Sequence, residues 1–90
     1  MSEHSLTVTA LGARVWRLDL DGAGSYEVSV PEGYLEKLGL AAIPPERVLE
    51  ESFRFLLERE SASSILRRFE LPVIARYFPE YEKDIGRRLA

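Results

Sequence analysis

Residues Trp16–Val30, WRLDLDGAGSYEVSV, contain two runs in which large apolar residues alternate with polar ones. Alternation with a period of two is typical of β-strands that bury one face. Between the runs, Asp21–Ser25 is rich in Asp and Gly, which favour turns. The stretch therefore predicts a β-hairpin that pairs Leu20 with Tyr26 and has one apolar face.

A third alternating run lies upstream, at Leu6 and Val8, and Gly12 marks the turn after it. A loop of about three residues would pair Val8 with Trp16. A slip of one residue would turn every apolar side chain of this strand to solvent, so the alternation favours a three-stranded antiparallel meander with one apolar face. An apolar sheet face must be buried against another element, and the rest of the chain must supply it.

Residues 32–90 contain the segments that can cover this face. Apolar residues recur there at helical spacing, and several prolines stand where a helix can begin. The expected helices are Glu32–Leu38, Pro45–Arg59, a short piece from Ser61 or Ser63 to Phe69, Pro72–Tyr77 and Pro79–Arg88. We predict an α+β fold of one domain, residues 1–90, in which a three-stranded antiparallel meander (residues 5–30) is followed by three to four helices packed on one sheet face (residues 32–90).

The predicted core combines the apolar face of the strands with the apolar stripes of the helices. Its expected members include Trp16, Leu18, Val28, Phe53, Leu57 and Ile74.

The composition limits the classes of protein to which the chain can belong. The 90 residues include no cysteine, which excludes disulfides and thiolate sites and fits a reducing cytoplasm. The sequence has no run of about 20 apolar residues that would span a membrane. It begins MSEHSLTV, without the basic and apolar regions of a secretory signal. We therefore expect a cytoplasmic protein without a membrane partner.

The chemistry-bearing residues do not assemble into a catalytic or metal-binding pattern. His4 is the single histidine, and Asp19 and Asp21 form an incomplete calcium loop that is better explained as a turn. Ser61 and Ser63 have no adjacent base and are expected to cap a helix. The sequence predicts no enzyme activity, no cofactor and no metal.

Residues 61–88 combine apolar and aromatic side chains with arginines, which is more apolar surface than a solvated tail requires. Tyrosine and arginine are enriched where protein interfaces concentrate their binding energy. The same tyrosines also suit a core that satisfies their hydroxyl groups, and both interpretations stay open. The predicted partner-binding residues, called here the arginine–tyrosine patch, are Arg67, Arg68, Arg76, Tyr77 and Tyr81.

Two resemblances add to this interpretation. The segments FLLERE (55–60), SILRRFEL (64–71) and IARYFPEY (74–81) resemble a group of small uncharacterised bacterial proteins, for which the resemblance implies no activity. The segments YEVSVP (26–31) and YLEKLGL (34–40) are similar to the strand–proline–helix region of AbrB-type swapped-hairpin regulators and antitoxins. That resemblance implies dimerisation and DNA binding by basic residues, whereas this chain has three glutamates there and Lys37 as the only base.

The net charge of −3 favours a protein partner over nucleic acid. Residues 46–90, which contain the arginines of the patch, carry equal numbers of acidic and basic residues, whereas nucleic-acid binders usually have a basic surplus. We predict a non-enzymatic protein–protein interaction module that associates with itself, as a homodimer, or docks on a partner protein. The alternative is a small DNA-associated regulator or antitoxin.

Overall fold

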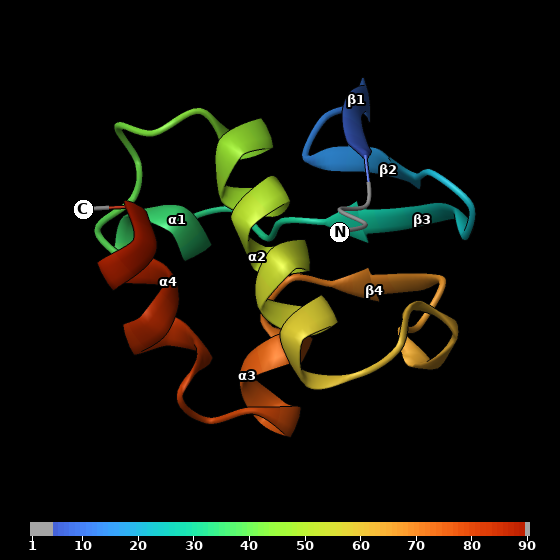
Figure 1. The fold of residues 1–90 in the computed structure, drawn as a ribbon. Coiled ribbons are helices and arrows are strands. Elements are labelled where there is room, and N and C mark those ends of the chain that lie inside the picture. The colour runs from blue at the N-terminus through green and yellow to red at the C-terminus, as the bar shows by residue number, and fades with distance from the viewer. Residues whose placement is uncertain (1–4, 90) are drawn as a thin grey trace.

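The structure, a computed structural model, describes residues 5–89 and has an α+β fold in which helices cover one face of a four-stranded sheet (Figure 1). The strands lie in the order β1-β2-β3-β4, with β1–β3 antiparallel and β4 parallel to β3. The strands are β1 (Leu6–Gly12), β2 (Val15–Leu20), β3 (Gly24–Ser29) and β4 (Arg68–Glu70). The helices are α1 (Tyr34–Lys37), α2 (Pro45–Arg59), the 3-10 turn η1 (Ala62–Ser64), α3 (Val73–Tyr77) and α4 (Tyr81–Leu89).

The predicted hairpin is confirmed, but its register is shifted by two residues. Leu18 lies opposite Tyr26, and Leu20 lies opposite Gly24. The turn is shorter than expected, because the Ala23 N–H donates to the Leu20 carbonyl at 2.9 Å and strand β3 begins at Gly24, with φ of 100°. A shift of two residues preserves the side-chain alternation, so the predicted apolar face is correct although the pairing is wrong.

The meander's first pair is shifted in the same way. Val8 lies opposite Leu18 instead of Trp16, and the pairing contains a β-bulge between Ala10 and Gly12. A bulge adds a residue to one strand and changes the register beyond it. Strand β1 therefore extends further than the predicted loop allowed.

Strand β4 replaces the helix that was expected to end near Phe69, and that expectation is wrong. Phe69 lies opposite Val28, and the Glu27 N–H donates to the Arg67 carbonyl at 2.8 Å. The ring of Phe69 is stacked on Phe53, with 6.2 Å between the ring centroids. These contacts between distant parts of the chain stabilise an extended segment.

The remaining predicted helices are present, and α2 has the predicted bounds, Pro45–Arg59. Of the predicted core residues, Trp16, Leu18, Val28, Phe53 and Ile74 are buried, whereas Leu57 is half-buried and packs against the core. The indole N–H of Trp16 donates to the carboxylate of Glu46 at 3.0 Å, which ties β2 to the start of α2.

The opposite face of the sheet carries polar and charged side chains. Arg17 pairs with Asp19 at 3.0 Å, and Arg68 pairs with Glu27 at 3.3 Å. A sheet that is covered on one face and solvated on the other has this alternation of apolar and polar residues. No helix within residues 5–89 is long and apolar enough to cross a membrane.

Candidate functional site

An apolar groove with a volume of about 240 Å³ lies between the end of α2, the segment around η1, strand β4 and helix α3, and is called here the β4–α3 groove. Its apolar walls include Leu56, Ile65, Leu66, Phe69, Ile74 and Tyr77. Two of these side chains are open to solvent, because Leu66 is 51% exposed and Tyr77 is 67% exposed. Among the described residues, Leu11 is the one other large hydrophobic residue that is exposed.

Local sequence explains why this groove stays open. Leu71 is buried, and its N–H donates to the Ser29 carbonyl at 2.8 Å, which holds the chain against β3 just before α3. Helix α3 then has only five residues and buries only Ile74. A helix of little more than one turn cannot cover the neighbouring apolar side chains, so the groove is left without a lid.

Tyr81 does not belong to this surface, which corrects its expected place in the arginine–tyrosine patch. Its side chain is fully buried, and its ring packs edge-on against Phe55 with 5.3 Å between the ring centroids. Its hydroxyl lies 2.7 Å from Ser52 Oγ. Burial raises the pKa of Tyr81. Tyr77 ends α3 and Tyr81 begins α4, so the helical phase does not continue between them and the two tyrosines face different surroundings.

The side chain of Arg67 connects the segment before β4 to the hairpin of β2 and β3. Its guanidinium lies over the Tyr26 ring, 4.5 Å from the ring centroid, and donates to the carbonyl groups of Ala23 and Ser25 at 2.9 and 3.3 Å. Arg68 pairs with Glu27 on the solvated sheet face. Both arginines therefore have contacts within the chain.

Arg76 is exposed and precedes Tyr77 on α3. The structure thus brings only part of the predicted patch to one place: Tyr77 lines the β4–α3 groove, Arg76 is its neighbour in sequence, and Tyr81 is in the core. A partner-binding role for these residues stays a prediction. The groove residue that sequence reasoning missed is Leu66, because the helix expected there hid its exposure.

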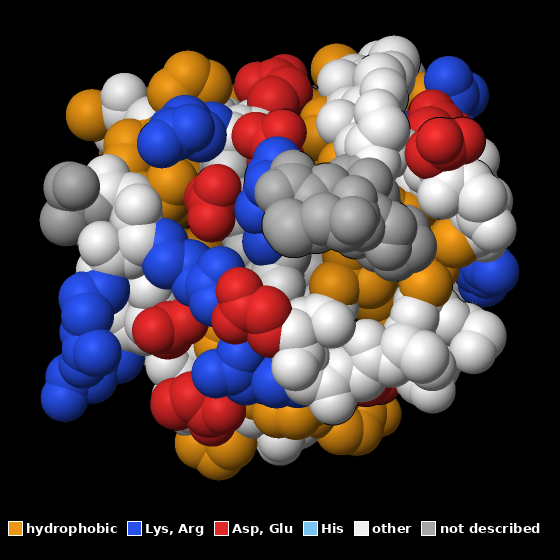
Figure 2. All heavy atoms as spheres, in the orientation of Figure 1, with side chains coloured by type: hydrophobic (Ala, Val, Ile, Leu, Met, Phe, Trp, Pro, Cys, Tyr) orange, Lys and Arg blue, Asp and Glu red, His pale blue; other side chains and the backbone are white. Residues whose placement is uncertain are grey.

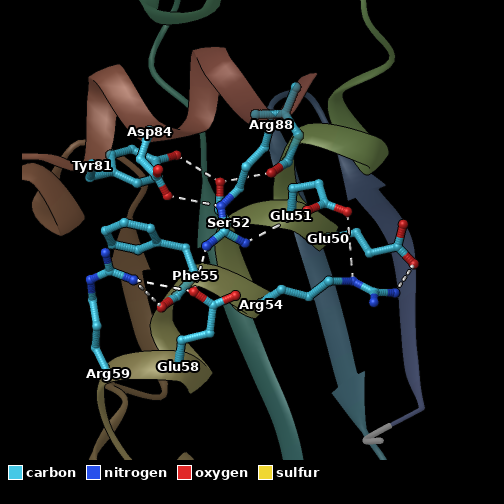
Figure 3. Close-up of polar contacts among 11 residues, drawn as sticks. Glu50, Glu51, Ser52, Arg54, Phe55, Glu58, Arg59, Tyr81, Asp84 and Arg88 are labelled. Atoms are coloured by element: carbon cyan, nitrogen blue, oxygen red, sulfur yellow. Dashed lines mark hydrogen bonds and ion pairs between the residues drawn. The ribbon is translucent and has the colours of Figure 1, made fainter. Parts of the chain in front are cut away.

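The close-up in Figure 3 shows a polar cluster apart from the groove, in which ion pairs join α2 to α4. Arg88 pairs with Asp84 at 2.9 Å and with Glu58, and its guanidinium lies 5.6 Å from the centroid of the Phe55 ring. Arg59 lies over the same ring at 3.6 Å. The hydrogen bond from Arg88 lowers the pKa of Glu58. Arg88 of α4 thus pairs with Glu58 of α2, and this cluster fastens α4 to α2.

Two further candidates from the sequence, Asp19 and Ser61, bond to neighbouring side chains. Hydrogen bonds from Ser25 and Arg17 lower the pKa of Asp19, which is held as a paired carboxylate. Ser61 makes no side-chain cap, contrary to expectation, and its hydroxyl instead lies within hydrogen-bond distance of Ser63 and Ser64. Within residues 5–89, no three His, Asp or Glu side chains are placed to hold a metal ion, and His4 lies outside the described residues.

Figure 2 shows that basic and acidic side chains lie next to one another over α2 and α4. In the same view, hydrophobic side chains reach the surface at the lower end of the molecule, where α3 lies in Figure 1. The visible face therefore lacks a continuous basic surface that would attract phosphate groups.

Comparison with known proteins found no similar protein. No protein-family model matches the chain, no curated protein is significantly similar to it in sequence, and no solved structure is significantly similar to it in fold. The function of the chain must therefore be inferred from its own residues and their geometry.

Proposed function

We propose that this protein is a non-enzymatic interaction module of the cytoplasm that docks on a partner protein through the β4–α3 groove. The observation that carries the proposal is the position of Leu66 and Tyr77, two exposed large hydrophobic residues beside one apolar hollow. Exposed apolar side chains that gather in one place mark interaction sites more often than chance exposure does.

The size of the groove favours a protein side chain as its occupant. Pockets for small-molecule ligands and cofactors usually have volumes of about 300–1,000 Å³. The β4–α3 groove has about 240 Å³, which suits an apolar anchor residue of a partner protein.

The charge beside the groove indicates what should flank that anchor. The carboxylate-bearing residue Glu60 lines the groove and forms no ion pair with the other described residues. Partner surfaces place opposite charges against each other, which adds specificity. We therefore propose a partner segment in which a leucine or phenylalanine anchor stands beside a lysine or arginine.

The contacts of two arginines support a protein partner over DNA. Arg67 bonds to backbone carbonyls and stacks on Tyr26, and Arg68 pairs with Glu27. Contact with phosphates would compete with these intramolecular contacts. The DNA-associated alternative thus has less support than protein docking.

A random peptide library, displayed and selected against the purified protein, tests the proposal. Selected peptides should carry an apolar anchor with a neighbouring basic residue. Replacing Leu66 with glutamate should weaken their binding at least about tenfold, because a carboxylate would have to be buried next to the anchor without a partner.

Leu11→Glu is the matched control, since Leu11 is also an exposed leucine but lies on β1, away from the groove. This variant should bind the peptides as the wild type does. The proposal is overturned if no peptide is selected, or if Leu66→Glu, with an unchanged melting temperature, binds as tightly as Leu11→Glu.

A further inference from the structure

The two edges of the sheet differ in how they are protected from pairing with other chains. Natural proteins blunt edge strands by keeping them short or by placing charges and prolines on them. Strand β4 has three residues, two of which are Arg68 and Glu70. Strand β1, LTVTALG, has seven residues and contains neither a charged residue nor a proline.

The backbone hydrogen bonds show which groups of β1 point away from the sheet. The Asp21 N–H donates to the Ser5 carbonyl at 2.9 Å, which sets the phase of the antiparallel pair. Bonded pairs alternate along such a pair, so Thr7 and Thr9 bond to β2 whereas Leu6, Val8 and Ala10 turn their N–H and C=O groups outward. No other strand within residues 5–89 lies on that side of β1.

We propose that β1 pairs antiparallel with β1 of a second copy of this chain, about a two-fold axis at Val8. The outward residues Leu6, Val8 and Ala10 are symmetric about Val8 in sequence. An antiparallel pairing centred there joins Leu6 to Ala10 of the second copy and satisfies all of these backbone groups at once. A two-fold interface uses the same surface on both copies and therefore must be complementary to itself.

The surface next to β1 carries charges of both signs, as an interface between two identical surfaces requires. Leu6 and Val8 are half-buried and form a shallow hollow of about 320 Å³ together with residues at the start of α2, including Arg47 and Glu50. A two-fold axis perpendicular to the sheet places the helices of both copies on the same side. Arg47 and Glu50 then provide opposite charges for the second copy's Glu50 and Arg47, with Glu50 also paired to Arg54 of its own chain at 3.2 Å, and the apolar side chains of Leu6 and Val8 approach those of the second copy.

This interface is on the opposite edge of the sheet from strand β4, so it can fail without affecting docking in the β4–α3 groove. The test is sedimentation equilibrium of the full chain over a range of concentrations. The wild type should be a dimer. Ala10→Lys should weaken dimerisation at least about tenfold, because Ala10 is exposed on the unpaired edge and a lysine there opposes strand addition.

Ala41→Lys is the matched control, because Ala41 is also exposed but lies between α1 and α2. It should dimerise like the wild type. A wild type that stays monomeric overturns the proposal, as does a folded Ala10→Lys variant that dimerises as tightly as Ala41→Lys.

Amide hydrogen exchange of the wild type gives a second measurement that does not depend on the folding of a variant. If β1 pairs with a second copy, the outward amide of Val8 should be protected to a similar degree as the inward amide of Thr9. Protection of Thr9 together with fast exchange of Val8 at high protein concentration would show that the edge is free and would overturn the proposal.

Discussion

Ser52 is the one buried polar residue among the core residues that the structure describes. Its hydroxyl lies 2.7 Å from the Val48 carbonyl and 2.7 Å from the Tyr81 hydroxyl (Figure 3). A carbonyl oxygen can only accept, so the single hydroxyl proton of Ser52 goes to Val48. Tyr81 must therefore donate to Ser52, and the three groups form a directed chain.

This direction predicts unequal effects of two substitutions on the free energy of unfolding. Ser52→Ala leaves the buried Tyr81 hydroxyl without an acceptor, which should cost about 1–3 kcal/mol. Tyr81→Phe removes the donor but leaves Ser52 bonded to Val48. It should therefore cost no more than the net contribution of one hydrogen bond to stability, about 0.5–1.5 kcal/mol. The double variant leaves neither group orphaned, and its cost should be smaller than the sum of the two single costs.

Urea and thermal unfolding of the four proteins measure this cycle. In a domain of this size, each 1 kcal/mol corresponds to a shift of about 4–8 °C in the melting temperature, so the difference between the single variants is measurable. Additive costs, or a Ser52→Ala variant no less stable than Tyr81→Phe, would refute the reasoning.

Three further predictions address the stability and the partner. The hydrogen bond from Arg88 lowers the pKa of Glu58 in the folded protein. Glu58 therefore binds a proton more readily in the unfolded chain, and the free energy of unfolding should fall as the pH drops below the ordinary glutamate pKa of about 4.3. Arg88→Gln should flatten this decline in urea melts at successive pH values, and an unaltered profile would contradict the assignment. Trp16→Ala should cost about 3–5 kcal/mol by urea unfolding, and an unchanged midpoint would count against the buried sheet face. Fluorescence anisotropy should detect no duplex DNA binding; binding that weakens steeply with salt and is lost in Arg68→Ala would favour the DNA-associated alternative.

The sequence was sufficient to predict which face of each meander strand is buried. Trp16, Leu18 and Val28 are all buried although both predicted registers are shifted, because a shift of two residues leaves the alternation unchanged. The register itself depends on turn length. Four of the five residues of Asp21–Ser25 suit a turn, so composition could not indicate that the strand resumes at Gly24.

Strand β4 could not be predicted from local patterns, because it exists through contacts distant in sequence. Its neighbour Arg67 accepts a hydrogen bond from Glu27, and Phe69 stacks on Phe53. A short helix was expected to end near Phe69, whereas the chain there is extended and leaves Leu66 exposed. The same error therefore hid both the strand and part of the groove.

Sequence spacing could not separate the two tyrosines of the arginine–tyrosine patch, whose partner-binding role stays a prediction. Tyr77 lines the groove as the interface interpretation requires, and Tyr81 is buried as the core interpretation requires. The break between α3 and α4 lies at Pro79, and it changes the face on which the following residues lie. A proline marks such a break in the sequence but does not indicate the direction in which the chain continues.

The most direct test of the docking groove is a chemical-shift map of the isotope-labelled protein titrated with a peptide from the library selection. The largest chemical-shift changes should occur at Leu66, Ile74 and Tyr77, with little change on the solvated sheet face. Largest shifts at Arg17 and Glu27, with the groove residues unchanged, would contradict the central claim that this protein binds its partner through the β4–α3 groove.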